Sequence, residues 1–185
     1  MVDCWFYRRI YMKHFTYVTW FINKFEMNVL VKVVIAYDSK YGNTKLAAEK
    51  ILEGMMEVKG IETAIGYIKE INVNKLADFD AIVLGAPNHM GRPSQAMNKF
   101  VNKLAELDLK SKKVVVFGTY AGKIRILDRA VKKLENIVTT KLPNLSLISP
   151  GGLSIRVNKI RGPIIEGELP KCINFGKKLA NQLKN

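Results

Sequence analysis

Three apolar segments, residues 31–36, 81–85 and 113–118, are too uniformly apolar for strands with one face in water. Such runs, rich in Val and Ile, are typical of parallel strands covered on both faces by helices. Between them, residues 46–58 and 94–107 repeat apolar side chains with a helical period, for example Met97, Phe100, Val101 and Leu104. The pattern therefore predicts an α/β fold.

The remaining elements follow from the same reading. Residues 61–68 alternate between apolar and polar side chains, which indicates a strand at a sheet edge. Residues 75–80 form a short connector, and helices are expected at 124–138 and 169–183. A fifth strand at 145–148 is interrupted by Pro150, Gly151 and Gly152 before it resumes at 153–157.

Strand and helix thus alternate five times with short connections, a pattern that predicts a parallel sheet with right-handed crossovers. We expect a three-layer α/β/α sandwich around one five-stranded parallel sheet. No internal domain boundary, repeat or low-complexity tract is visible, and residues 27–185 are expected to form a single domain.

The loop after the first strand has the composition of a phosphate cradle. It combines hydroxyl, amide and glycine residues just before a helix: Ser39, Lys40, Tyr41, Gly42, Asn43 and Thr44. Free backbone N–H groups and the positive end of the helix dipole converge on an anion at such a place. An ordinary turn, in which Asn43 or Thr44 only caps the helix, is the alternative reading.

Two further loops follow buried strands and are also rich in Gly, hydroxyl or amide groups. In a doubly wound sheet, ligands bind outside the carboxyl ends of the strands, where the strand order reverses. The three loops together therefore favour a ligand site more strongly than any one of them. The additional candidate residues are Pro87, Asn88, His89, Met90, Gly91, Thr119, Tyr120 and Gly122.

Several of these motifs resemble those of one known family. Ser39-x-x-Gly42-Asn43-Thr44 after a buried strand resembles the FMN-phosphate loop of flavodoxins, although Tyr41 replaces the usual Thr or Ser. Gly85-x-Pro87 with Gly91, Gly118-Thr119-Tyr120 and the segment from residue 152 to 180 are also similar to that family. The resemblance covers about residues 29–183 and implies the flavodoxin-like strand order 2-1-3-4-5.

The resemblance also implies roles for the loops. Residues 39–44 would hold the FMN phosphate, and residues 87–91 would flank the N5 edge of the flavin ring. Residues 119–122 would line the pyrimidine end, with Tyr120 a candidate stacking partner. Tyr41 and Tyr120 could instead be half-buried packing residues, and His89 an ordinary loop residue.

Residues 1–26 differ from the rest of the chain. They contain nine of its seventeen aromatic residues without a sustained period. Their longest apolar-leaning run, residues 15–22, is well short of the ~20 residues of a membrane span. We interpret this N-terminal extension as disordered or as upstream sequence, with Met27 the native start, or alternatively as a membrane-surface or partner-binding arm.

The first functional hypothesis is an FMN-binding electron carrier of low molecular weight. The alternative, an FMN-dependent NAD(P)H:quinone reductase, would use His89, Met90 and the open loop to admit a quinone. A flavin-free module that binds nucleic acid through a basic surface is a third reading, suggested by the net charge of +14 over 185 residues. Aromatic and basic residues are not interleaved in the body of the chain, which argues against specific nucleic-acid recognition.

Other chemistries find little support in the sequence. Cys4 and Cys172 lack the spacing of a zinc or iron–sulfur site, and Cys172 reads as a buried thiol. The acidic pair of a receiver domain and the Gly-x-Ser-x-Gly elbow of a hydrolase are missing. Nothing implies disulfides, so we expect a cytoplasmic oxidoreductase without a metal site.

The positive charge extends over the whole body of the chain. Residues 1–26 hold four basic and two acidic residues, which leaves 26 basic against 14 acidic in the rest. Arg92, Lys123 and Arg125 follow the second and third loops, so positive charge is expected around the flavin. The expectation is a higher potential for the second electron than in acidic relatives, and acidic redox partners such as ferredoxin-type carriers.

Overall fold

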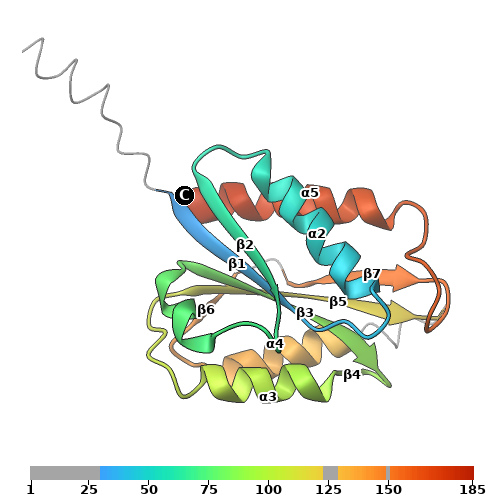
Figure 1. Cartoon of the computed structure of the whole chain (residues 1–185), viewed down its shortest axis with the longest axis horizontal. Coiled ribbons are helices and arrows are strands. Elements are labelled where there is room, and N and C mark those ends of the chain that lie inside the picture. The colour runs from blue at the N-terminus through green and yellow to red at the C-terminus, as the bar shows by residue number, and fades with distance from the viewer. Residues whose placement is uncertain (1–29, 123–128, 149–150) are drawn as a thin grey trace, which may run out of the picture.

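The computed structural model describes residues 30–122, 129–148 and 151–185, and these form a parallel sheet between two helical layers (Figure 1). Its main strands are β1 (Val31–Tyr37), β2 (Ile61–Tyr67), β3 (Ala81–His89), β5 (Lys113–Ala121), β6 (Ser146–Leu147) and β7 (Leu153–Val157). They are arranged in the order β2-β1-β3-β5, with β6 and β7 both pairing with β5. This is the predicted order 2-1-3-4-5, with β2 at the edge where its alternating pattern placed it.

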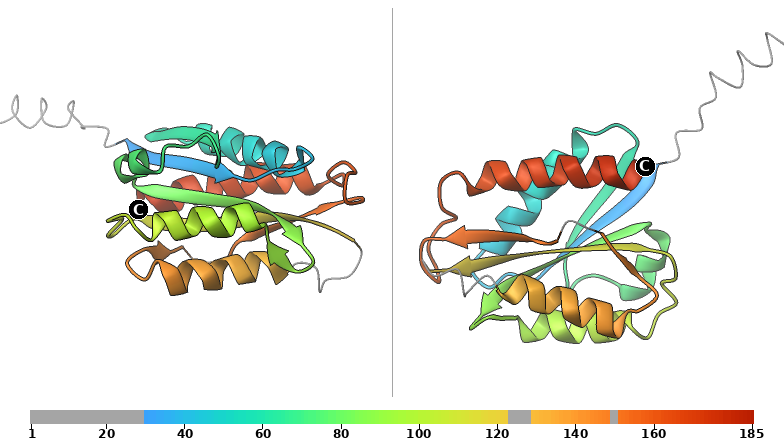
Figure 2. Two further views of the ribbon diagram at one scale, coloured as in Figure 1. Left: turned by 60° about the horizontal axis from the view of Figure 1, so that its bottom comes forward. Right: turned by 180° about the vertical axis from the view of Figure 1, so that it is seen from behind.

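The alternation of side chains along each strand divides the core between the two faces. Val33, Ile35 and Phe117 pack under α2 (Asn43–Met56) and α5 (Glu168–Lys184). Val34 and Leu84 pack on the opposite face, under α3 (Gln95–Leu104) and α4 (Arg129–Lys141). Both layers are visible in Figure 2. Because both faces are covered, the strands need no polar positions, which explains the continuous apolar runs.

Helices α2 and α5 approach one another closely at two glycines. A Cβ atom on Gly54 would lie 2.0 Å from the backbone oxygen of Ile173, and one on Gly176 would lie 2.1 Å from that of Ile51. No side chain fits at either position. This contact fixes the position of α2, whose N-terminus faces the carboxyl end of the sheet.

Several predicted boundaries were wrong by a few residues. Strand β3 continues to His89 and turns back through β4 (Arg92–Pro93) in an antiparallel hairpin, where the sequence predicted a loop from residue 86. Strand β5 likewise runs to Ala121, three residues beyond the expected end. The connector expected at residues 75–80 overlaps a 3-10 helix, Val73–Asp78. Gly and Pro near the ends of β3 and β5 had suggested breaks, but pairing with neighbouring strands keeps both strands extended.

The fifth strand is divided as predicted. β6 pairs with the beginning of β5 and β7 with its end, so the two pieces occupy one edge position on either side of the Gly and Pro residues. Some expectations lie outside the described residues: the N-terminal extension 1–26 with Met27, the beginning of the helix at 124–128, Lys123, Arg125 and Pro150.

Candidate functional site

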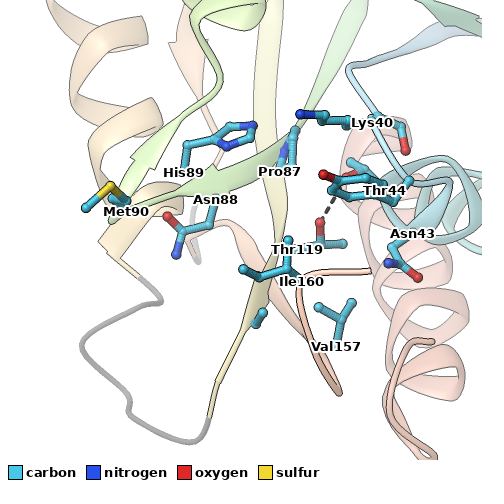
Figure 3. Close-up of a pocket in the computed structure, with 13 residues that line it drawn as sticks. Lys40, Asn43, Thr44, Pro87, Asn88, His89, Met90, Thr119, Val157 and Ile160 are labelled. Carbon is cyan, nitrogen blue, oxygen red and sulfur yellow. Dashed lines mark hydrogen bonds between the residues drawn. The ribbon is translucent and has the colours of Figure 1, made fainter. Parts of the chain in front are cut away.

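The carboxyl ends of the central strands surround a cavity of about 310 Å³ (Figure 3). Its lining comes from the loop after β1, the ends of β3 and β5, and the segment after β7. The lining residues are Ser39, Lys40, Tyr41, Asn43, Thr44, Pro87, Asn88, His89, Met90, Thr119, Ala121, Val157 and Ile160. All three loops identified in the sequence therefore meet at one place, at the position where the order of the strands reverses.

The loop before α2 offers an uncapped helix end. Gly42 is the N-cap residue, with φ +84°, and no side chain accepts a hydrogen bond from the first turn. The first turn contains no acidic residue, and the position of a Cβ on Gly42 has no neighbour within 4 Å. The N–H groups of this turn and the helix dipole are thus available to an anion.

The Ser39 hydroxyl is a second polar group in this loop that has no partner among the described residues of the protein. In the part of the chain that the structure describes, it is one of two buried side-chain polar atoms without a hydrogen-bond partner. An unsatisfied buried hydroxyl costs free energy, so such a group in a native protein calls for an explanation. A bound anion in the loop would accept this hydrogen bond, and the residues present therefore fit a phosphate group.

Thr44 and Thr119 join the first and third loops beneath the cavity. Their hydroxyl oxygens lie 2.8 Å apart, and both residues are buried. One hydroxyl donates to the other, which leaves one hydroxyl hydrogen free for a further acceptor. The pair fixes the beginning of α2 against the end of β5, although the two residues are 75 positions apart in the sequence.

The hairpin after β3 forms the rim of the cavity. Met90 and Gly91 have φ values of +54° and +79° and connect Asn88 and His89 to the paired residues Arg92 and Pro93. Positive φ at both central positions is the mark of a type I′ turn. The Asn88 Oδ1 atom accepts a hydrogen bond of 2.6 Å from the Gly91 N–H. Met90 is 97% exposed at the tip.

The segment after β7 contributes residues that the sequence reading did not include in the site. Val157 and Ile160 line the cavity, and Asn43 Nδ2 donates a hydrogen bond of 2.8 Å to the Gly162 carbonyl. The only sequence signal was that this segment shared in the family resemblance. Its place in the site depends on packing between distant parts of the chain.

Two cations lie close to the Tyr41 ring. The Arg161 guanidinium carbon is 5.5 Å from the centre of its ring, and the Lys40 ammonium is 5.4 Å from it. Both distances are in the range of cation–π interactions. Hydrogen bonding to Arg161, and to a lesser extent to Lys40, stabilises the phenolate and lowers the pKa of Tyr41. The cradle is therefore electropositive.

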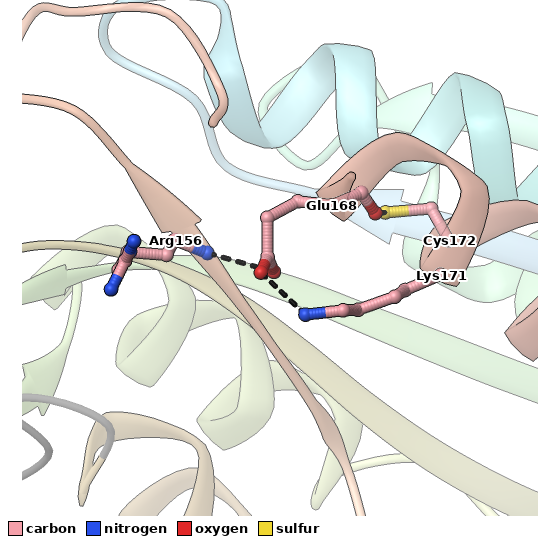
Figure 4. Close-up of polar contacts among 4 residues, drawn as sticks. All are labelled: Arg156, Glu168, Lys171 and Cys172. Atoms are coloured by element: carbon pink, nitrogen blue, oxygen red, sulfur yellow. Dashed lines mark hydrogen bonds and ion pairs between the residues drawn. The ribbon is translucent and has the colours of Figure 1, made fainter. Parts of the chain in front are cut away.

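A glutamate at the start of α5 holds the end of β7 in place (Figure 4). One carboxylate oxygen of Glu168 accepts a hydrogen bond of 3.2 Å from the Arg156 backbone N–H, and the other is 2.6 Å from the Lys171 ammonium. The Cys172 thiol donates to the Glu168 carbonyl at 3.4 Å. Residues 156–157 are thereby fixed relative to α5.

Four of the predicted site residues do not line the cavity. Gly42 and Gly91 shape the turns that present their neighbours, and Gly122 follows the end of β5 with φ +120°. The Tyr120 side chain points to the opposite face of the strand from those of Thr119 and Ala121, because successive side chains alternate. The structure does not bring Tyr120 into the main cavity.

Within the described ranges, no group of three or more His, Cys, Asp or Glu residues is arranged to hold a metal ion. Among the helices described, none has both the length and the apolar character needed to cross a membrane.

Comparison with known proteins agrees with the fold. Residues 34–144 match the flavodoxin domain family. The chain is 25% identical over 164 residues to a flavodoxin from Clostridium saccharobutylicum, an alignment that covers 83% of this chain and 98% of that protein. It is 28% identical over 169 residues to the uncharacterized protein MJ0732 of Methanocaldococcus jannaschii, covering 89% of this chain but 39% of that longer protein.

A solved flavodoxin structure from the domain Archaea superposes with a TM-score of 0.69 at 21% identity. The superposition covers 83% of this chain and 99% of the archaeal one. Similarity at this level of identity supports the three-layer fold and the order of its strands.

Proposed function

Because the chain belongs to the flavodoxin domain family, whose cofactor is FMN, we propose that it is an electron carrier of low molecular weight that shuttles one or two electrons between redox proteins. The observation that supports this most directly is the phosphate cradle. The uncapped start of α2 and the unpartnered Ser39 hydroxyl both point to an anion at the site predicted for the FMN phosphate.

The residues around the cavity have distinct roles in this proposal. Residues 39–44 hold the phosphate, the Pro87–Gly91 hairpin flanks the flavin ring, and Thr119 and Ala121 line its pyrimidine end. Bound FMN supplies the redox chemistry, while the protein binds it, orients it and tunes it through nearby charges. Gly91, with φ +79°, gives the hairpin a backbone shape that most residues resist.

The rim of the cavity is suited to a protein partner. Met90 and Ile160 are 97% and 73% exposed, and both line the cavity. The exposed basic residues Arg92 and Arg161 lie next to them in the same two segments, and Lys40 lines the cavity from the loop after β1. Exposed apolar side chains with positive charge nearby favour an acidic partner protein. We propose a ferredoxin-type carrier in the cytoplasm.

Flavin binding tests the proposal. The full-length protein purified from a flavin-replete host should show a flavin absorption spectrum, and apoprotein should take up FMN at micromolar concentration. Ser39→Ala should weaken FMN binding by about tenfold, because a charge-assisted hydrogen bond is lost. Ser146→Ala, at an exposed serine outside the cavity, is the matched control. Colourless protein that takes up no FMN would contradict the proposal.

A quinone reductase remains the second candidate, supported by the way the cavity opens at His89 and Met90. Both side chains line it, and both are exposed. Steady-state oxidation of NAD(P)H with a benzoquinone separates the two functions. A carrier should give turnover no faster than free FMN, whereas faster turnover would favour the reductase.

A further inference from the structure

The segment after β7 forms a hydrogen-bonded turn beside the phosphate loop. The Gly162 N–H donates to the Lys159 carbonyl at 3.0 Å, so residues 159–162 form a tight turn, and the Asn158 N–H donates to the Pro163 carbonyl at 2.9 Å. The Asn43 side chain, in the first turn of α2, donates to the carbonyl of Gly162. The turn is therefore attached directly to the loop that begins α2.

This attachment brings a guanidinium group to the edge of the cradle. Arg161 does not itself line the cavity, but it contacts Tyr41, which does. Arg161 precedes Gly162 in the turn. Its guanidinium carbon lies 5.5 Å from the ring centre of Tyr41, a residue of the loop between β1 and α2. A guanidinium is always charged and presents a planar set of donors that matches a phosphate. A phosphate monoester is largely dianionic at neutral pH, and the first turn of α2 adds no carboxylate of its own to repel it.

We propose that Arg161 is an anion-binding residue of this site, and that it makes the site select phosphorylated flavin over the same ring without phosphate. The inference rests on the proposed function, since the ligand is FMN. It adds a second positively charged residue, supplied by a distant part of the chain, to a loop whose own cation is Lys40.

Two features indicate that Arg161 is positioned for this role and is not an ordinary surface cation. Its stacking on Tyr41 and the fixed turn reduce the freedom that an exposed arginine would lose on binding. Tyr41, which replaces the usual hydroxyl residue of the motif, then acts as a platform that holds the guanidinium near the anion. This role would explain why the loop has Tyr41 where the motif usually has Thr or Ser.

The experiment compares FMN with riboflavin on three full-length proteins: wild type, Arg161→Gln and Lys159→Gln. Lys159 is an exposed cation in the same turn, so its variant removes the same charge from nearly the same place. Affinities are measured by quenching of flavin fluorescence at low and at high salt. Circular dichroism checks that each variant is folded.

Arg161→Gln should weaken FMN binding by about tenfold at low salt and less at high salt, because salt screens the charge. Riboflavin affinity should change less than twofold, and Lys159→Gln should resemble the wild type. An equal loss for both flavins, or an equal effect of the two substitutions, would overturn the inference. Unchanged FMN affinity in Arg161→Gln would overturn the inference about Arg161 but leave the proposed function standing. A wild type that binds neither flavin would overturn both.

Discussion

The Thr44 and Thr119 hydroxyls form a buried hydrogen bond of 2.8 Å between the first turn of α2 and the end of β5. These are the two loops that the proposal assigns to the phosphate and to the pyrimidine end of one ligand. Their relative position is thus set by a direct contact between side chains that are 1% and 5% exposed.

Thr119→Val removes one partner of this hydrogen bond at nearly constant volume. The Thr44 hydroxyl is then left buried and unpaired, which should lower the free energy of unfolding by about 1–3 kcal/mol. Urea denaturation measures the change. In the double variant with Thr44→Val the two losses should be less than additive, and full additivity would show that the hydroxyls do not interact.

Gly54→Ala should be strongly destabilising because its Cβ would meet the Ile173 backbone oxygen at 2.0 Å. Separating α2 from α5 to relieve the clash should cost about 3 kcal/mol or more, measured as a shift of the urea midpoint. Gly42→Ala is the control: nothing obstructs its Cβ, so only the cost of φ +84° remains, about 1 kcal/mol. Equal losses in both variants would mean that the helices are not in close contact.

Substitution of Met90 at the hairpin tip should raise the stability of the protein but lower its rate of electron exchange with a partner. Met90 has φ +54°, and Asn-Gly is the sequence preferred in a type I′ turn. Met90→Asn should therefore raise the unfolding free energy by about 1 kcal/mol. It should also slow electron exchange with a partner protein, because an apolar contact is lost. Exchange that is not slowed, measured by stopped flow, would exclude the hairpin tip from docking.

Charge reversal at the rim should change the redox potential. Arg92 is exposed beside the hairpin, and Arg92→Glu replaces a charge that favours the reduced, anionic flavin by one that opposes it. The potential of the second electron should fall by roughly tens of millivolts at low salt and by less at high salt. Lys184→Glu, the same change at the far end of α5, is the control. An equal shift in both variants would contradict local tuning.

The Cys172 thiol should make stability depend on alkaline pH. Burial, reinforced by the nearby Glu168 carboxylate, raises the pKa of Cys172 from 9.0 to about 12. From pH 9 to 12 the unfolded chain would lose this proton while the folded chain keeps it, so stability falls by about 1.4 kcal/mol per pH unit. Below pH 9 this contribution is fully present.

Cys172→Ala isolates the effect, because lysines also titrate in this range. In a Cys4→Ala background, the variant should be less stable at neutral pH but should show a shallower decline above pH 9. Iodoacetamide at pH 8 should label Cys172 slowly in the folded Cys4→Ala protein, because the thiol is buried. Parallel pH profiles in the two proteins would show that the thiol is not protonated preferentially in the folded state.

Much of the fold could be read from local patterns. The uniform apolar runs identified strands buried on both faces, because only such strands have no wet side. The alternating residues 61–68 identified the edge strand, and Gly and Pro after Ile148 marked the divided fifth strand. The loop composition at residues 39–44 predicted a phosphate site, since hydroxyl, amide and glycine residues act through their own local chemistry, and this site stays a prediction.

Tertiary structure alone decided which distant segments meet. Asn43 contacts Gly162 across 119 positions, and Tyr41 contacts Arg161, because the close packing of α2 on α5 and the Glu168 contact with β7 bring the two loops together. The same holds for Tyr120, which the continuation of β5 turns away from the cavity while Thr119 turns into it. Local sequence specifies elements and loop chemistry, whereas contacts between elements arise from packing summed over the whole chain.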